Sequence, residues 1–158
     1  MSSIILCPTR GGEASVPNQE RAIAIAKQRG CDLLFLYVSN IEFLGLTAVP
    51  KLIDFEAEMD EMGEFMLVMA QERAEAAGIR ALTHVHRGNF NDVLVEVIHE
   101  YQISTVILGS SAGDTGVITP EYIQNLATEI GGMTGVEFII VDQGEIIKTY
   151  QPKRKNQP

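Results

Sequence analysis

The part of the chain best suited to chemistry is a glycine-bearing segment between a β-prone run and a helix start, "VILGSSAGDTGVITPEY" at residues 106–122. Gly109, Gly113 and Gly116 can adopt positive φ, so successive backbone N–H groups can point into one concavity. Hydroxyl side chains add donors, and a helix starting at Thr119 presents free N–H groups and its positive dipole end. These features suit a phosphate group, and they equally suit a bare loop that turns tightly at a strand end.

A second glycine turn, "TRGGEAS" at residues 9–15, joins the first β-prone run to the first helical pattern. Arg10 can offer a guanidinium fork to a phosphate or carboxylate, and the alternative is a solvated arginine paired with Glu13. The turn is weakly similar to the Ser-Gly-Gly-x-Asp-Ser loop of pyrophosphate-releasing ATP enzymes. Because Arg10 replaces the first serine of that loop and Ala14 its aspartate, an ATP-consuming enzyme is the least favoured of three hypotheses.

The remaining reactive side chains suggest no reaction centre. His84 and His86 lie two residues apart, hence on one face of a strand, but no cysteine or carboxylate pattern completes a metal site with His99. Cys7 and Cys31 lie in or beside apolar segments, which is typical of reduced, buried thiols in a cytosolic protein. The sequence therefore predicts no catalytic residue and no metal site, and it favours binding over catalysis.

Five apolar runs alternate with four helical patterns, and these elements must position the two glycine turns. The predicted strands are Ser3–Pro8, Cys31–Val38, Ile79–Gly88, residues 104–109 and Val136–Asp142. The predicted helices are residues 18–30, Lys51–Ala77, Asn89–Gln102 and residues 119–132. Helix starts and stops are expected at Ser15 with Pro17, Gly30, Gly78, Asn89 or Asn91, and Thr119 with Pro120. A methionine stripe on the second helix, assigned to the core or a subunit interface, comprises Met59, Met62, Met66 and Met69.

Strands that are apolar on both faces and alternate with helices indicate an α/β fold with a parallel sheet covered on both sides. In such sheets, ligands bind beyond the carboxyl ends of the strands, where the strand order reverses. The candidate site therefore comprises Pro8–Gly12, Val38–Ser39, Gly88 and Gly109–Thr119.

The charge of the chain is unevenly distributed. The net charge is −9. Residues 144–158 hold four basic side chains and one acidic side chain, so they contribute +3 and the rest of the chain −12. An acidic body argues against nucleic acid as a partner. The basic end, residues 144–158, is predicted to be a flexible, solvated tail that follows a single domain at residues 1–143. No apolar run is long enough to span a membrane, and no signal peptide is evident.

Over residues 3–142 the chain resembles the universal stress protein family. The similarity lies in "IILCPTRGGEAS" before a helix, "DLLFLYV", "VHRGN" before a helix, and "VILGSS…TGVITPEY" before "VEFIIV". The resemblance implies a single five-stranded parallel sheet of order 3-2-1-4-5 in an adenine-nucleotide alpha-hydrolase-like fold. It also implies ATP or AMP binding, dimers formed partly through the fifth strand, and a role in stress signalling rather than efficient catalysis.

The resemblance assigns site residues one by one. Pro8 and Thr9 match the family's residues at the end of strand one, and Val38 matches the position whose backbone meets adenine. Gly109 and Gly116 match the first and last glycines of the motif Gly-x2-Gly-x9-Gly-(Ser/Thr). The nucleotide-binding residues implied are Pro8, Thr9, Arg10, Gly11, Gly12, Val38, Gly109, Ser110, Ser111, Gly113, Gly116, Val117, Ile118 and Thr119.

The chain departs from the family pattern at two places. Arg10 stands where the family usually has an acidic residue. Gly109 and Gly116 are seven residues apart instead of the motif's thirteen, the middle glycine is replaced by Ala112, and Val117 occupies the Ser/Thr position. The loop that normally wraps a triphosphate is therefore too short.

The sequence accordingly predicts a cytoplasmic, homodimeric regulator in the stress response that binds an adenine nucleotide, with AMP favoured over tightly held ATP. The dimer is expected to form through Val136–Val141, because an apolar edge strand is otherwise sticky. The alternative is a dimeric interaction module of the same fold that binds no nucleotide.

Overall fold

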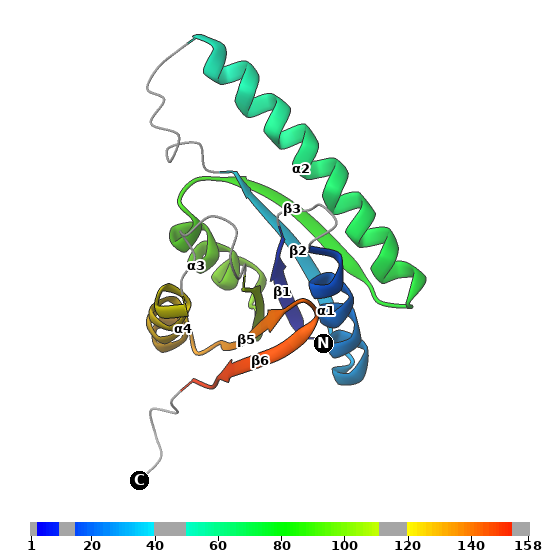
Figure 1. The fold of residues 1–158 in the computed structure, drawn as a ribbon, viewed down its shortest axis with the longest axis vertical. Helices are drawn as coiled ribbons and strands as arrows, with labels where there is room; N and C mark the ends of the chain where they lie inside the picture. The colour runs from blue at the N-terminus through cyan, green and yellow to red at the C-terminus, as the bar shows by residue number, and fades with distance from the viewer. Residues whose placement is uncertain (1–2, 10–14, 40–49, 111–119, 153–158) are drawn as a thin grey trace.

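A computed structural model of the chain describes residues 3–9, 15–39, 50–110 and 120–152. For residues 50–60 it describes the backbone alone. Its strands are β1 (Ile4–Pro8), β2 (Asp32–Ser39), β3 (Ala81–Arg87), β4 (Thr105–Gly109), β5 (Glu137–Asp142) and β6 (Glu145–Tyr150). Its helices are α1 (Val16–Arg29), α2 (Pro50–Ala76), α3 (Phe90–Tyr101) and α4 (Pro120–Thr134). The strand order is β3-β2-β1-β4-β5-β6, so the order 3-2-1-4-5 predicted for the first five strands is confirmed (Figure 1).

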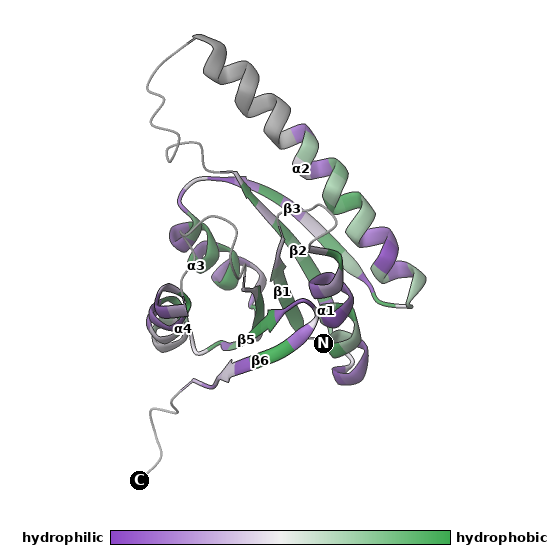
Figure 2. Ribbon diagram, viewed as in Figure 1, coloured by the Kyte–Doolittle hydropathy of each residue, from purple (hydrophilic) through white to green (hydrophobic). Residues whose placement is uncertain are grey.

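Alternating side chains of the parallel strands fill two cores. On one face, Leu6, Val106 and Phe138 pack with α3 and α4. On the other face, strand residues such as Phe35 and Ile107 pack with α1 and α2. The helices accordingly lie on both sides of the sheet (Figure 1), and the central strands are hydrophobic along most of their length (Figure 2). This arrangement explains why these strands are not amphipathic in sequence.

Local signals in the sequence account for several helix ends. Pro17 lies in the first turn of α1, and Gly30 ends this helix with a φ of 69°. Ser15 holds the N-cap position of α1 but makes no side-chain capping bond. Asn89 is the cap of α3, because its side-chain oxygen accepts hydrogen bonds from the N–H groups of Asn91 and Asp92. Of the two asparagines proposed as this cap, the first one is correct.

The sixth strand was not predicted. Residues 144–158 were expected to be a flexible tail, but Glu145–Tyr150 form β6 and pair antiparallel with β5. Gln143 and Gly144 make the connection with φ values of 49° and 82°. Two central residues with positive φ form the type of tight turn whose twist matches that of a β-hairpin. The sheet therefore has five parallel strands and one antiparallel edge strand.

This hairpin changes the expected dimer surface. The outer edge of β5 was expected to meet a second copy, but β6 of the same chain occupies it. Ile139, on β5, is 2% exposed and packs with α1 and α2, so its side chain cannot face a partner. On β6, Ile146 and Ile147 are 47% and 56% exposed. The open edge of the sheet on this side therefore belongs to β6.

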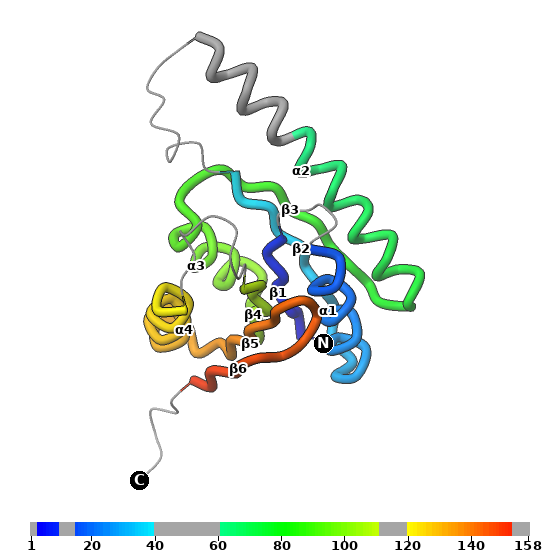
Figure 3. Tube along the Cα trace, viewed as in Figure 1, coloured from blue at the N-terminus to red at the C-terminus, as the bar shows by residue number. Residues whose placement is uncertain are grey.

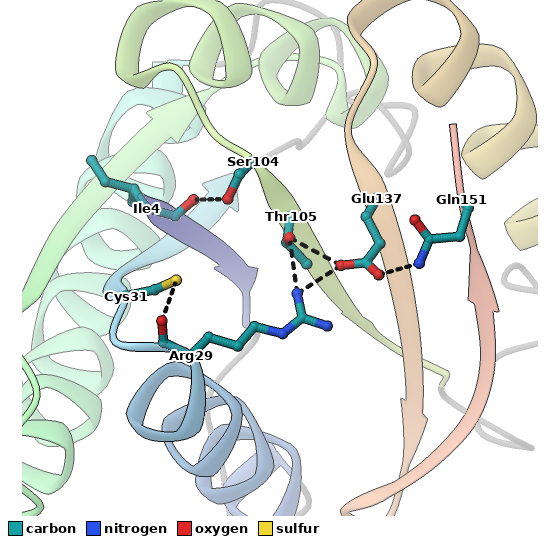
Figure 4. A network of polar contacts seen from close by, with 7 residues as sticks. All are labelled: Ile4, Arg29, Cys31, Ser104, Thr105, Glu137 and Gln151. Carbon is teal, nitrogen blue, oxygen red and sulfur yellow. Dashed lines mark hydrogen bonds and ion pairs between the residues drawn. The ribbon is translucent and has the colours of Figure 1, made fainter. Parts of the chain in front are cut away.

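At the amino ends of β4 and β5, a polar cluster joins α1, these two strands and the residue that follows β6 (Figure 4). The Nη1 atom of Arg29, at the end of α1, lies 2.7 Å from Oε1 of Glu137 at the start of β5. The hydroxyl of Thr105 donates to the same carboxylate oxygen at 3.1 Å, and Gln151 donates to the other oxygen. Burial raises the pKa of Glu137, but the hydrogen bond and charge of Arg29, together with the hydrogen bonds of Gln151 and Thr105, outweigh it, so the pKa lies below its usual value. We refer to Arg29, Thr105, Glu137 and Gln151 as the amino-end clasp.

Candidate functional site

The structure describes five of the predicted site residues: Pro8, Thr9, Val38, Gly109 and Ser110. Pro8 and Gly109 end parallel strands, Thr9 and Ser110 follow them, and Val38 is the next-to-last residue of β2, so all five lie at the carboxyl edge of the sheet, as predicted. The other predicted site residues lie outside the described residues, and their roles stay predictions. These are Arg10, Gly11, Gly12, Ser111, Gly113, Gly116, Val117, Ile118 and Thr119.

The strand order reverses between β1 and β4. Chain connections run from β1 toward β2 and β3 on one side, and toward β4, β5 and β6 on the other. The β1–β4 register covers Ile5 with Thr105 and Leu6 with Val106, whereas β1 pairs with β2 along its whole length, from Ile4 to Pro8. The carboxyl ends of β1 and β4 therefore lie beyond the paired segment of these strands. This is the position at which open α/β sheets bind ligands.

A buried amide fixes the end of β1. The side chain of Gln19, on the first turn of α1, is 3% exposed. Its Nε2 donates to the Thr9 hydroxyl at 2.8 Å and to the Ser15 hydroxyl at 3.2 Å, and its Oε1 accepts from Nη1 of Arg73 at 2.6 Å. The Thr9 N–H also donates to the carbonyl of Leu36 at 2.8 Å. One side chain thereby ties β1, α1 and α2 together beside the site.

A second amide fixes the end of β4. Asn18 accepts a hydrogen bond from the Gly144 N–H at 2.9 Å, so α1 holds the β5–β6 turn. The same amide lies against Gly109, because a Cβ at this glycine would stand 2.9 Å from Nδ2 of Asn18. The Ser110 N–H donates to the carbonyl of Val141 at 2.7 Å, which extends the β4–β5 pairing past Gly109. The start of the glycine segment is therefore held by backbone and amide contacts.

Two guanidinium groups lie close to these amides: one contacts Gln19 itself, and the other contacts the backbone of Gly144, which Asn18 also binds. Nε of Arg21 donates to the Gly144 carbonyl at 2.5 Å, and Arg73 donates to Gln19. Among the described side chains, neither arginine forms an ion pair. Their charges are solvated or act on neutral oxygen atoms, which leaves a positive contribution to the field near this edge of an acidic chain. An anion bound at this edge would interact favourably with these two positive charges.

The structure also places the other side chains considered for chemistry. Cys7 is 3% exposed, and burial raises its pKa to about 12, so its thiol is protonated and inert. The ring centroids of His84 and His86 lie 5.4 Å apart, and His86 lies 3.6 Å from a Glu96 oxygen. No group of three metal-ligating side chains occurs in the part of the chain that the structure describes. None of the helices described there is long and apolar enough to cross a membrane.

Sequence reasoning missed Asn18 and Gln19, which the structure places beside the site. Both lie in the sequence "PNQE", one turn into the first helix. Their signal was weak, since polar residues near a helix start are usually solvated. The burial of Gln19 depends on Thr9, Ser15 and Arg73, which come from three separate parts of the chain.

Comparison with known proteins agrees with this geometry. A model of the universal stress protein family matches residues 1–118. The universal stress protein MJ0531 of Methanocaldococcus jannaschii is 26% identical over 114 residues, which cover 72% of this chain. The chain spans 66% of the length of that relative.

Solved structures share the fold at low identity. Universal stress protein UspA from Lactobacillus plantarum has a TM-score of 0.68 and 16% identity, with 88% of this chain and 97% of that chain covered. A universal stress protein in complex with cAMP has a TM-score of 0.61 and 19% identity, covering 90% and 98%. One from Archaeoglobus fulgidus in complex with dAMP has a TM-score of 0.52 and 14% identity, covering 90% and 97%.

Proposed function

Because this chain belongs to the universal stress protein family, we propose that it is a regulatory protein that binds an adenine nucleotide beyond the carboxyl ends of β1 and β4. The observation that carries the proposal is the divergence of these two strands at the reversal of strand order, beside the ordered contacts of Thr9 and Gly109. The cAMP and dAMP complexes of proteins with this fold support an adenine nucleotide as the ligand class. The protein acts in the cytoplasm as a sensor of nucleotide rather than as an efficient enzyme.

AMP is the preferred ligand in this proposal. The spacing from Gly109 to Gly116 is shorter than the family's phosphate loop, so fewer backbone donors are available for a triphosphate. The two nucleotides in the complexes above, cAMP and dAMP, each carry one phosphate. ATP is therefore expected to bind in the high-micromolar range or more weakly, with a binding free energy on the order of −5 kcal/mol.

Native mass spectrometry of freshly purified full-length protein tests the proposal first, since it reports a retained ligand and the oligomeric state together. Calorimetry with AMP, adenosine and ATP then ranks the ligands. In Arg10→Ala, AMP affinity should fall by about tenfold or more while adenosine affinity changes little, because a charged hydrogen bond contributes about 1.5–3 kcal/mol. Arg80→Ala is the matched control, because that side chain is 75% exposed and its ion pair with Asp32 is long, at 4.0 Å. Equal losses for AMP and adenosine, or submicromolar ATP binding, would contradict the assignment.

The homodimer belongs to the same proposal, with its surface moved to β6. Antiparallel pairing of β6 with β6 of a second copy would extend the sheet and cover Ile146 and Ile147. Ile147→Lys should then give a monomer in sedimentation velocity, whereas Ile139→Lys should destabilise the fold, because Ile139 is buried. A dimer that persists in Ile147→Lys would exclude this surface.

The alternative is a module of the same fold that binds no nucleotide. Exposed apolar side chains on α2, none of them among the proposed site residues, favour it. Purified protein that carries no small molecule and binds neither AMP nor adenosine would establish this alternative.

A further inference from the structure

An apolar row lies exposed on the described part of α2. Met62, Phe65 and Met69 are 56%, 68% and 47% exposed, and Met66 is half-buried beside them. Their spacing of 3, 1 and 3 residues places all four on one side of a helix. We refer to Met62, Phe65, Met66 and Met69 as the α2 stripe. The methionine pattern was assigned from the sequence to the core or to a subunit interface, and the structure leaves this part of it outside the core.

The rotation of α2 is fixed by its inner side, so the α2 stripe cannot turn inward. Leu67, Ala70 and Ala74 are at most 1% exposed and pack against the sheet. Gly63 lies so close to Tyr37 of β2 that a Cβ would stand 2.5 Å from the tyrosine ring. Figure 3 shows the coloured part of α2 running alongside β2 and β3, with which it is in contact. The stripe is therefore a stable feature of the surface.

An acidic row borders the α2 stripe. Glu61, Glu64, Glu72 and Glu75 are exposed and lie at positions −7, −4, +4 and +7 from Val68, so they share one side of the helix. Val68, itself 46% exposed, lies within this row. Arg73, the basic side chain in this part of α2, is half-buried and directed to Gln19. The surface thus combines adaptable methionines with four carboxylates.

We propose that the α2 stripe with its acidic row is the docking surface for a cationic amphipathic helix of a partner protein. Apolar side chains of such a helix at i, i+3, i+4 and i+7 would cover Phe65 and the three methionines, which adapt easily in shape. Lysine or arginine side chains beside them would face the four glutamates. A second copy of α2 fits less well, because it would bring another acidic row to the same surface. This surface shares no residue with the proposed nucleotide site, and the proposal does not depend on nucleotide binding.

The test uses the full-length protein without added nucleotide and a 20-residue helical peptide of leucine, alanine and lysine, with leucines at i, i+3, i+4 and i+7. A second peptide has glutamate in place of lysine. Fluorescence anisotropy should detect binding of the lysine peptide and not of the glutamate peptide. Phe65→Ser should weaken binding by about tenfold or more, as expected for a central aromatic contact. Met133→Gln is the matched apolar control, since Met133 is 63% exposed on α4, and it should leave binding unchanged.

A charge control separates docking from general attraction to an acidic protein. Glu64→Gln combined with Glu72→Gln should weaken binding and reduce its salt dependence, whereas Glu121→Gln combined with Glu129→Gln on α4 should do so much less. Equal effects of the two double variants, or full binding by Phe65→Ser, would overturn the proposal. Sedimentation that showed self-association abolished by Phe65→Ser would also overturn it, in favour of a second copy. Since AMP binding is measured separately, failure here leaves the nucleotide proposal standing.

Discussion

The two ends of the parallel sheet are held together by different chemistry. At the amino end, Arg29 and Glu137 neutralise each other across α1 and β5, and Thr105 and Gln151 bind the same carboxylate. At the carboxyl end, the side-chain amides of Asn18 and Gln19 make the hydrogen bonds that connect the elements. Arg21 and Arg73 donate there to neutral oxygen atoms. At the amino end, the positive charge of Arg29 is therefore neutralised by a carboxylate. At the carboxyl end, the strand ends are held by hydrogen bonds, and the charges of the arginines are not neutralised by an ion pair among the described side chains.

We expect this difference to separate a structural role at the amino end from the proposed binding role at the carboxyl end. A carboxylate already paired with arginine has little to offer a ligand, so the amino-end clasp should act on stability alone. At the carboxyl end, neutral amides orient the strand ends and leave charge available for an anion. Substitutions at the two ends should accordingly differ in what they change, and the following experiments test this from the largest expected effect to the smallest.

The largest effect is expected for Gln19→Ala. It removes three hydrogen bonds and leaves a buried hydroxyl and a guanidinium without this partner, so the free energy of unfolding should fall by about 2–3 kcal/mol. Urea denaturation measures it. The matched control is Gln71→Ala, which loses a single bond, from Nε2 to the Ala81 carbonyl at 2.7 Å, and should lose about 1 kcal/mol. Equal losses would show that the carboxyl-end network is no more cooperative than one isolated bond.

Gly144→Ala tests the hairpin that α1 holds at the carboxyl end. Gly144 has a φ of 82°, and a Cβ there would lie 3.1 Å from the Pro17 carbonyl oxygen. The left-handed backbone and this contact together should cost about 1–2 kcal/mol. Gly78→Ala has a similar φ of 85° with no atom within 4 Å, so it isolates the backbone term. If Gly144→Ala lowers the melting temperature no more than Gly78→Ala does, close packing of Gly144 against Pro17 of α1 does not contribute to the stability of the turn.

Glu137→Gln tests the amino-end clasp, and a loss of about 1 kcal/mol at neutral pH is expected for this partly exposed ion pair. Because the folded state lowers the pKa of Glu137, its contribution is complete above the unfolded pKa and is lost as the pH falls through the folded pKa. The difference in stability between Glu137→Gln and the unaltered protein should therefore shrink as the pH falls through the lowered pKa of Glu137 in the folded state.

Two controls complete the test of the clasp. Asp32→Asn breaks a looser pair, 4.0 Å from the 75% exposed Arg80, and should change stability by less than about 0.5 kcal/mol. Adenine-nucleotide affinity should be the same in Glu137→Gln as in the unaltered protein. A change in that affinity would mean that the two ends of the sheet are coupled, against the separation of roles argued above.

Apart from the control substitutions, the smallest effect on stability is expected for Gly109→Ala. The added Cβ would displace the Asn18 amide by a few tenths of an ångström, which should cost about 0.5–1 kcal/mol through the weakened contact with Gly144. Any nucleotide bound at the end of β4 should be affected more than the fold is. Unchanged AMP affinity in calorimetry, together with a normal melting temperature, would indicate that the ligand does not approach Gly109.

Much of the fold was determined by the sequence alone. Strands such as "DLLFLYV" are apolar on both faces, and this pattern requires a sheet covered on both sides, as the two cores around Phe35 and Phe138 show. Helix boundaries followed from local chemistry at Pro17, Gly30 and Asn89. These signals are strong because they act within one or two turns of the chain. The sixth strand had a local signal too, since Gln143–Gly144 precede the β-prone "EIIKTY", but the basic residues around it suggested a tail.

Only the tertiary structure decided which polar residues meet. Arg29 and Glu137 are 108 residues apart in sequence, and Gln19 and Arg73 are 54 apart, so neither contact has a local pattern. The exposure of Phe65 and Met62 was equally hidden, because the helical stripe of methionines is the same in sequence whether a core or solvent covers it. Burial at Gly63 and Leu67 set the rotation of α2 and thereby placed that stripe on the surface. Local periodicity fixes which residues share a face of an element, but packing against the sheet fixes which face is buried.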